Sequence, residues 1–231
     1  MQKLIFIHGS GNTARVWRYQ IQHFTNAEAV NLPGHLSPAE PCTSVEDYVA
    51  WLHGYIREQG YSAPVLAGHS LGGAIVQMYA LKEPDGVRAI ILAGTGARLR
   101  VAPQYLAAMQ DGIDRPSTWL QDFVAPQYGR INSELKKELL AETAKVGAKV
   151  QLNDFLCCDK FDMMEKVHQI KVPTLVLCGS DDVLTPPKYS SYLAARIEGA
   201  KLTVVDGGSH YFFAEKPGVV NQAIEQFLRD L

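Results

Sequence analysis

Serine, aspartate and histidine, the residue types that together support nucleophilic catalysis, recur in this sequence directly after short apolar runs. Ser70 lies in Gly68-His69-Ser70-Leu71-Gly72, between the apolar run Val65–Ala67 and an apolar pattern typical of a helix. This stretch fits G-x-S-x-G, in which a serine occupies a strained strand-to-helix turn and the glycines let the turn close. Because a serine hydroxyl is a weak nucleophile at neutral pH, it needs an adjacent base and a third group that orients the base. Without such partners, the same stretch is an ordinary strand-to-helix loop.

Candidates for the two partners follow later apolar runs. Asp181 and Asp182 come after the fifth run of the chain, and Asp206 and His210 come after the sixth. Loops at the carboxyl ends of parallel strands meet at one edge of a sheet, which is where open α/β sheets place their sites. The sequence therefore predicts that a serine, an acid and a histidine lie close together, with three aspartates as alternatives for the acid.

The elements that must position these side chains are six short apolar runs that alternate with helical patterns. The runs cover residues 3–7, 27–32, 65–67, 87–93, 173–178 and 201–205. Continuous apolar strands between helices are typical of a parallel sheet covered on both faces. We therefore predict an α/β fold with a mostly parallel sheet of about six strands flanked by helices. The capping box Thr43-x-x-Glu46 predicts the start of the helix that precedes the third strand.

The alternation is interrupted between Arg98 and His168, where only helical patterns occur. They cover residues 101–109, 118–124, 133–146 and 150–157, and Ser133 is the expected N-cap of the third. An interruption of this length is too long for a simple crossover. We predict a core formed by residues 1–97 and 169–231, and a helical cap, residues 98–168, inserted after the fourth strand.

Composition and charge exclude several classes of function. The net charge is −2 and the sequence pI is about 6.4, so no basic field points to nucleic acid or an anionic membrane. No signal peptide is visible, and no apolar run approaches the roughly 18 residues of a membrane span. The four cysteines show neither C-x-x-C nor metal-ligand spacing, which indicates a reduced, cytoplasmic protein. We expect no metal or organic cofactor, and the oligomeric state is not indicated.

The chain resembles the α/β-hydrolase fold superfamily, as a serine esterase- or lipase-like member with a helical cap. Four motifs carry the resemblance, each at the end of a strand-like run and in the expected order: His8-Gly9-Ser10-Gly11, Gly68-His69-Ser70-Leu71-Gly72, Gly179-x-x-Asp182-x-x-x-Pro186, and Gly208-Ser209-His210. The match covers nearly the whole chain outside the helical insertion.

The resemblance implies roles for individual residues. Ser70 would be the nucleophile, His210 the general base, and Asp182 the orienting acid, because the family pattern places the acid three residues after a glycine and four before a proline. The backbone N–H groups of Ser10 and Leu71 would form the oxyanion hole. The order Ser, Asp, His along the chain is also that of this family.

Five of the other six histidines are not expected to act as the base, and the sequence departs from the family pattern in two places. We expect His8 to be structural, His69 to point away from the site, and His23, His53 and His168 to lie at the surface, with His35 undecided. The second strand ends in Asn31-Leu32-Pro33-Gly34-His35-Leu36-Ser37, where such proteins often have Asp-x-x-Gly-x-Gly-x-Ser. The hairpin that commonly precedes the first strand is absent, so we expect a minimal six-strand version.

The expected activity is that of a carboxylesterase-like serine hydrolase, which cleaves a small, mainly apolar ester through an acyl-enzyme. Residues expected to contact substrate are Gly11, Trp119, Phe123, Leu184 and Tyr211, and the cap residues Val101, Met109 and Phe155 are further candidates. For the cap residues, plain packing between helices is the alternative. C–C bond hydrolysis, a lyase reaction and perhydrolysis on the same triad remain open, as does a non-catalytic small-molecule receptor. A haloalkane dehalogenase needs a carboxylate nucleophile, and Ser70 argues against it.

Overall fold

A six-stranded, entirely parallel sheet forms the centre of the computed structural model, which describes residues 3–231. Its strands are β1 (Leu4–Ile7), β2 (Ala27–Val30), β3 (Val65–His69), β4 (Ala89–Ala93), β5 (Thr174–Gly179) and β6 (Lys201–Val205). They lie side by side in the order β2-β1-β3-β4-β5-β6. The predicted number of strands and their parallel direction are confirmed, and the carboxyl ends of all six strands lie at one edge.

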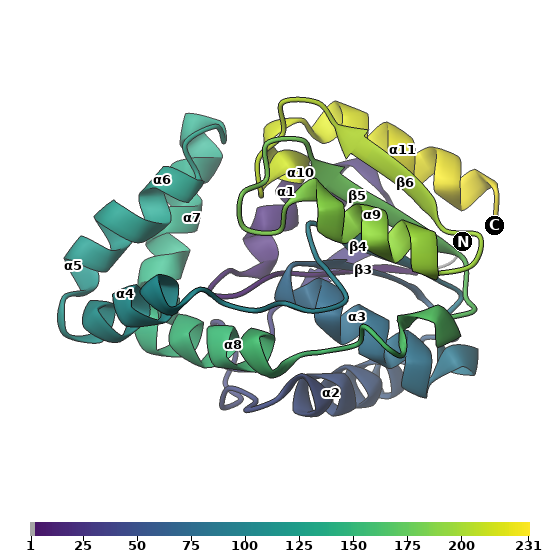
Figure 1. The fold of residues 1–231 in the computed structure, drawn as a ribbon, viewed down its shortest axis with the longest axis horizontal. Coiled ribbons are helices and arrows are strands. Elements are labelled where there is room, and N and C mark those ends of the chain that lie inside the picture. The colour runs from purple at the N-terminus through teal and green to yellow at the C-terminus, as the bar shows by residue number, and fades with distance from the viewer. Residues whose placement is uncertain (1–2) are drawn as a thin grey trace.

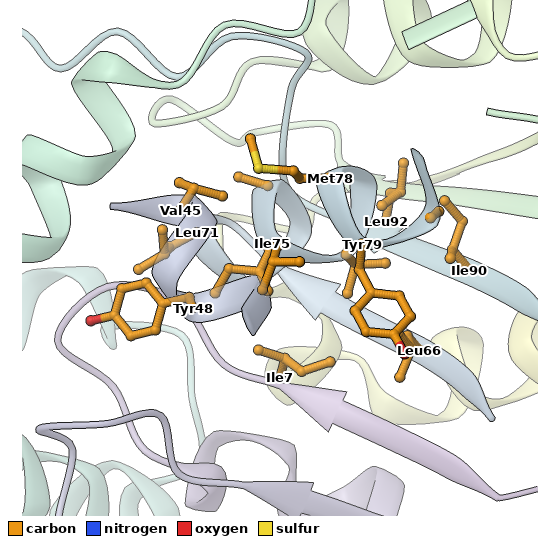
Figure 2. Packing of buried hydrophobic residues seen from close by; sticks show 14 of the residues in the cluster. Ile7, Val45, Tyr48, Leu66, Leu71, Ile75, Met78, Tyr79, Ile90 and Leu92 are labelled. Carbon is orange, nitrogen blue, oxygen red and sulfur yellow. The ribbon is translucent and has the colours of Figure 1, made fainter. Parts of the chain in front are cut away.

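Helices cover both faces of the sheet, which explains why the inner strands are buried throughout and mainly apolar. One face carries α2 (Val45–Glu58), α3 (Leu71–Lys82) and α9 (Pro187–Arg196), and the other carries α1 (Arg18–His23) and α11 (Pro217–Arg229). In Figure 2, Ile7 and Leu66 from the sheet lie beside Tyr48 of α2 and Ile75 of α3. Helix α11 is buried along a single stripe, Val220, Ile224 and Phe227, as its spacing predicts.

Two predicted helix starts are wrong by one residue. The N-cap of α2 is Ser44 rather than Thr43, because the Ser44 hydroxyl accepts the Asp47 N–H at 3.1 Å. The N-cap of the cap helix α7 is Asn132, whose side-chain oxygen accepts the Glu134 N–H at 2.9 Å. In both cases the residue with non-helical dihedrals and an oxygen within reach of the first turn takes the capping position.

The helical insertion lies between β4 and β5, to one side of the sheet (Figure 1). Its helices are α4 (Pro103–Asp114), α5 (Pro116–Thr118), a π-helical turn (Trp119–Val124), α6 (Ala125–Gln127), α7 (Ser133–Val146) and α8 (Ala148–Lys160). The two ends of the insertion meet, because Arg98 and Asp162 form an antiparallel bridge and an ion pair at 3.3 Å. Over residues 3–231, every helix is too short or too polar to cross a membrane.

Candidate active site

Ser70 lies on a strained turn between β3 and α3. Its backbone dihedrals, φ 54° and ψ −115°, are rare for a residue with a side chain. The turn closes only because its neighbours lack side chains: a Cβ on Gly68 would lie 2.1 Å from the Gly72 carbonyl oxygen, and one on Gly72 would lie 2.4 Å from that of Ile7. The G-x-S-x-G spacing therefore has a steric cause here, and the half-buried Ser70 side chain is held outward.

The backbone of Ser70 is fixed by four hydrogen bonds. Its N–H donates to the Ala93 carbonyl at 3.0 Å. Its own carbonyl accepts from the Gly73 N–H and the Thr95 hydroxyl, both at 2.9 Å, and from the Ala74 N–H at 3.2 Å. Such contacts over-determine a strained conformation and keep it in place.

His210 and Asp182, which follow β6 and β5, form a hydrogen-bonded pair. His210 Nδ1 lies 2.8 Å from Asp182 Oδ2. A carboxylate only accepts, so Nδ1 carries the proton and the Nε2 lone pair is free to act as a base. Of the other two aspartates, Asp181 pairs with Arg130 at 2.8 Å, and Asp206 is exposed. Asp182 is thus the carboxylate that the fold places against His210.

Asp182 is buried and fully hydrogen-bonded. Its Oδ1 accepts the N–H groups of Leu184 and Thr185, both at 2.9 Å, and its Oδ2 accepts the Thr185 hydroxyl at 2.8 Å as well as His210. Burial alone raises the pKa of the Asp182 carboxyl, but the His210 ring and the hydrogen bonds outweigh burial and hold the pKa below its ordinary value. The carboxylate therefore stays ionised, as the orientation of the imidazole requires.

A cavity of about 360 Å³ lies between this edge of the sheet and the cap. Ser10, Ser70 and His210 all line it. Within residues 3–231, no hydrogen bond joins the Ser70 hydroxyl to the His210 ring. Catalytic hydrogen bonds of this kind are often long without substrate.

Two backbone N–H groups beside Ser70 are suited to bind an oxyanion. The Leu71 N–H lies in the first turn of α3, where N–H groups lack an intrahelical partner. The Ser10 N–H, at the end of β1, bonds to no other residue in the described chain. The adjoining Gly9 carbonyl accepts from His8 Nδ1 at 2.9 Å and the Asn12 N–H at 3.2 Å, which fixes the plane of the peptide that carries the Ser10 N–H.

The predicted substrate-contacting residues divide into three groups, two of which line cavities. Leu184 and Tyr211 line the cavity, as do the cap residues Val101 and Phe155. Phe123 instead lines an adjoining cavity of about 410 Å³ that also reaches His210.

Three of these residues lie away from the cavity lining. Trp119 is buried inside the cap, where its indole N–H donates to Gln151 Oε1 at 2.9 Å, and Met109 is buried beside it. Gly11 is covered by Gln151. A large apolar residue in a cap helix packs equally well inward or toward the cavity, so its spacing alone does not place it.

The histidines take the following positions. His8 Nε2 accepts the Leu32 N–H at 3.0 Å, and His69 Nε2 donates to the His210 carbonyl at 3.1 Å, so both rings support the loops of the site. Burial, together with a neighbouring histidine, holds the pKa of each of these two rings well below its ordinary value. His35, undecided from sequence, is fully buried against Asp154 of α8.

Sequence reasoning missed three features of the site. Arg100 and Lys188 lie at the cavity rim, and Asp154 is a buried carboxylate in the cap. The residues around Asp154 in the sequence are a mixture of polar and apolar types. The sequence pattern therefore does not distinguish Asp154 from a surface aspartate. Over residues 3–231, His, Cys, Asp and Glu side chains form no group of three that could hold a metal ion.

Comparison with known proteins assigns the fold to a family. A family model described as "Alpha/beta hydrolase family" matches residues 4–223, and the chain belongs to this family. A solved structure described as a thermophilic esterase is 31% identical, with a TM-score of 0.84 over 100% of this chain and 90% of the other.

Two curated relatives are hydrolases of similar length. A pimeloyl-[acyl-carrier protein] methyl ester esterase of Neisseria meningitidis is 26% identical over 91% of this chain and 86% of its own. An (E)-2-((N-methylformamido)methylene)succinate hydrolase of Acinetobacter baylyi is 26% identical over 98% and 90%, respectively. Esterases and other hydrolases are thus among the relatives of this chain.

Proposed function

We propose that this protein is a carboxylesterase-like serine hydrolase, with Ser70 as nucleophile, His210 as general base and Asp182 as orienting acid. The observation that supports it best is the 2.8 Å contact between His210 Nδ1 and Asp182 Oδ2, at the wall of the cavity that Ser70 also lines. In the neutral imidazole, that contact places the proton on Nδ1 and leaves the lone pair on Nε2, as a general base requires.

In the proposed reaction, Ser70 Oγ attacks the ester carbonyl carbon while its proton passes to His210 Nε2. The oxyanion is bound by the Ser10 and Leu71 N–H groups, and removal of one such donor typically costs about 2.7–4 kcal/mol. The tetrahedral intermediate collapses, His210 returns the proton to the leaving alcohol, and an acyl-enzyme on Ser70 remains. Water, deprotonated by His210, then releases the acid and restores Ser70.

The proposed substrate is a small, mainly apolar ester. The apolar part of the cavity wall comes from Leu99, Val101, Phe155, Leu184 and Tyr211. At the rim, Arg100 and Lys188 are cationic, and none of the described lining residues is acidic. This charge balance favours an ester with an anionic far end over a neutral ester of equal length.

A chemical probe and one variant test the proposed function. Wild-type protein should hydrolyse p-nitrophenyl butyrate. It should also react with a fluorophosphonate at Ser70, with loss of HF, and gain the mass of the phosphonyl group. Ser70→Ala should abolish both. Turnover that persists in pure Ser70→Ala protein would refute the assignment of the nucleophile.

The alternatives give different results in the same assays. C–C bond hydrolysis, a lyase reaction or perhydrolysis would retain the Ser70 adduct but show higher kcat/KM on their own substrates than on any ester of a chain-length series. A receptor would bind a small molecule without an adduct. We further propose that the protein is cytoplasmic and that its binding partner is its small-molecule substrate. We do not propose binding to nucleic acid or to a membrane, in accord with the net charge of −2.

A further inference from the structure

The loop that carries Ser10 is covered by one face of the cap helix α8. Gln151, Asp154 and Cys158 share this face, because residues three and four apart lie on the same side of a helix. Cys158 Sγ lies 3.6 Å from Ser10 Oγ, and a Cβ on Gly11 would lie 2.8 Å from the Gln151 side chain. The cap thus contacts the expected oxyanion loop directly.

Asp154 makes the most specific of these contacts. Its carboxylate is fully buried, and Oδ2 accepts the Gly11 N–H at 2.8 Å and lies 2.8 Å from His35 Nε2. Oδ1 accepts the Tyr48 hydroxyl at 3.0 Å. The Gly11 N–H belongs to the peptide group that leaves Ser10, so this contact fixes the backbone directly after the expected donor.

The partner of Asp154 is a charged histidine. His35 Nδ1 donates to the Pro33 carbonyl at 3.0 Å, and Nε2 faces the carboxylate, so both ring nitrogens carry protons. Burial alone lowers the pKa of His35, but the Asp154 charge and hydrogen bonds raise it above its ordinary value. The neighbouring His8 ring, 4.8 Å away, is neutral because burial and His35 lower its pKa. The Asp154 carboxyl group therefore accepts from three donors, one of them a charged ring.

We propose that Asp154 is a positioning residue for the oxyanion hole: by holding the Gly11 N–H, it keeps the Ser10 N–H directed at the reacting carbonyl oxygen. Helix α8 is then a fixed wall of the active site. The proposal rests on the proposed function, and neither the family relationship nor the triad requires it.

A neighbouring contact provides the matched control. Asn153 Nδ2 donates to the Cys42 carbonyl at 2.7 Å, which also joins α8 to the core but outside the residues that line the cavity. If Asp154 only attached the cap to the core, its loss and the loss of the Asn153 contact would have the same kind of effect. A positioning role affects kcat at Asp154 alone.

The experiment compares Asp154→Ala, Asp154→Asn and Asn153→Ala with wild type on p-nitrophenyl butyrate. Rates are expressed per active site, counted by complete fluorophosphonate labelling, so that unfolded protein does not contribute. We expect Asp154→Ala to lower kcat by up to about 100-fold with KM changed less than about threefold, because a misplacement of about 1 Å has that effect. Asp154→Asn keeps a carbonyl oxygen for the Gly11 N–H and should lose about three- to tenfold.

Hydrogen exchange of residues 8–13 provides a second measurement that needs no substrate. Exchange should be faster in both Asp154 variants and unchanged in Asn153→Ala, whose kcat should stay within about twofold of wild type. Wild-type kcat per site in Asp154→Ala, or an equal loss in Asn153→Ala, would overturn the proposal. If Asp154→Ala does not fold, Asp154→Asn decides, since wild-type kcat and wild-type exchange together would overturn it.

The same measurements separate this proposal from the proposed function. Absence of turnover and of a Ser70 adduct in wild type would refute the function, whatever the Asp154 variants do. An active wild type with an insensitive Asp154 would refute only the positioning role.

Discussion

Substitution of Asp182 by Asn tests the orientation of the proposed base. The amide nearly matches the carboxylate in shape, and its oxygen can accept the Leu184 and Thr185 N–H groups that Asp182 Oδ1 accepts at 2.9 Å. The amide NH₂ then faces His210 Nδ1, which must become an acceptor. The ring proton moves to Nε2, and His210 can no longer take the proton of Ser70.

The expected loss in kcat is about 10⁴-fold, which corresponds to about 5.4 kcal/mol at 1.36 kcal/mol per tenfold. Initial rates on p-nitrophenyl butyrate measure it, and thermal unfolding shows whether the variant is folded. Asp181→Asn is the matched control, because Asp181 is exposed and pairs with Arg130. Its kcat should stay within about threefold of wild type. Asp182→Asn with more than a tenth of wild-type kcat, or an equal loss in Asp181→Asn, would show that Asp182 does not orient the base.

Three further predictions concern charge and packing. His35→Gln removes one partner of a buried ion pair, which typically costs about 3–5 kcal/mol because the other charge is left unpaired. Because the folded-state pKa of His35 is raised, the stability that depends on its charge is complete below about pH 6.5 and is lost as the pH rises through the folded-state pKa. Urea unfolding should therefore show a larger difference from wild type at about pH 6 than at about pH 9. Arg100→Gln and Lys188→Met should each lower kcat/KM about two- to fivefold for the p-nitrophenyl half-ester of glutaric acid and leave p-nitrophenyl butyrate unchanged, an effect that added salt should reduce. Gly72→Ala should destabilise the fold by about 1–3 kcal/mol in urea, because its Cβ would lie 2.4 Å from the Ile7 oxygen.

Contrary results would be informative for each of these. A pH-independent effect of His35→Gln would mean that His35 is neutral in the fold. Equal losses on both p-nitrophenyl esters would mean that the rim cations act on the fold and not on substrate charge. Wild-type stability of Gly72→Ala would mean that β1 and α3 can separate at no cost.

The sheet was predictable from sequence because its strands are buried on both faces, so each reads as an apolar run of its own. The two edge strands are less buried. In β2 only Val30 is buried, and in β6 Leu202 and Val204 are exposed, yet the β-branched composition of β6 still marks it as a strand. Helix starts were less predictable. At α2, two adjacent hydroxyl residues both fit the capping pattern, and only the backbone dihedrals decide between them.

The positions of Ser70, Asp182 and His210 were predictable for a different reason. Each lies a few residues after a strand, and parallel strands bring their carboxyl ends to one edge whatever the helices do. Trp119 and Met109 were not predictable in this way, because they belong to cap helices whose rotation about their own axes depends on packing. The structure turns both inward, where the Trp119 indole N–H has a partner.

The burial of Asp154 could not be predicted from the sequence. An aspartate in the middle of a helix that contains both polar and apolar residues is expected at the surface, because burial of a carboxylate without partners is unfavourable. Here three donors from three separate segments, Gly11, His35 and Tyr48, converge on it and offset that cost. A charge held this way is costly to move, because displacement of α8 would leave both His35 and Asp154 unpaired.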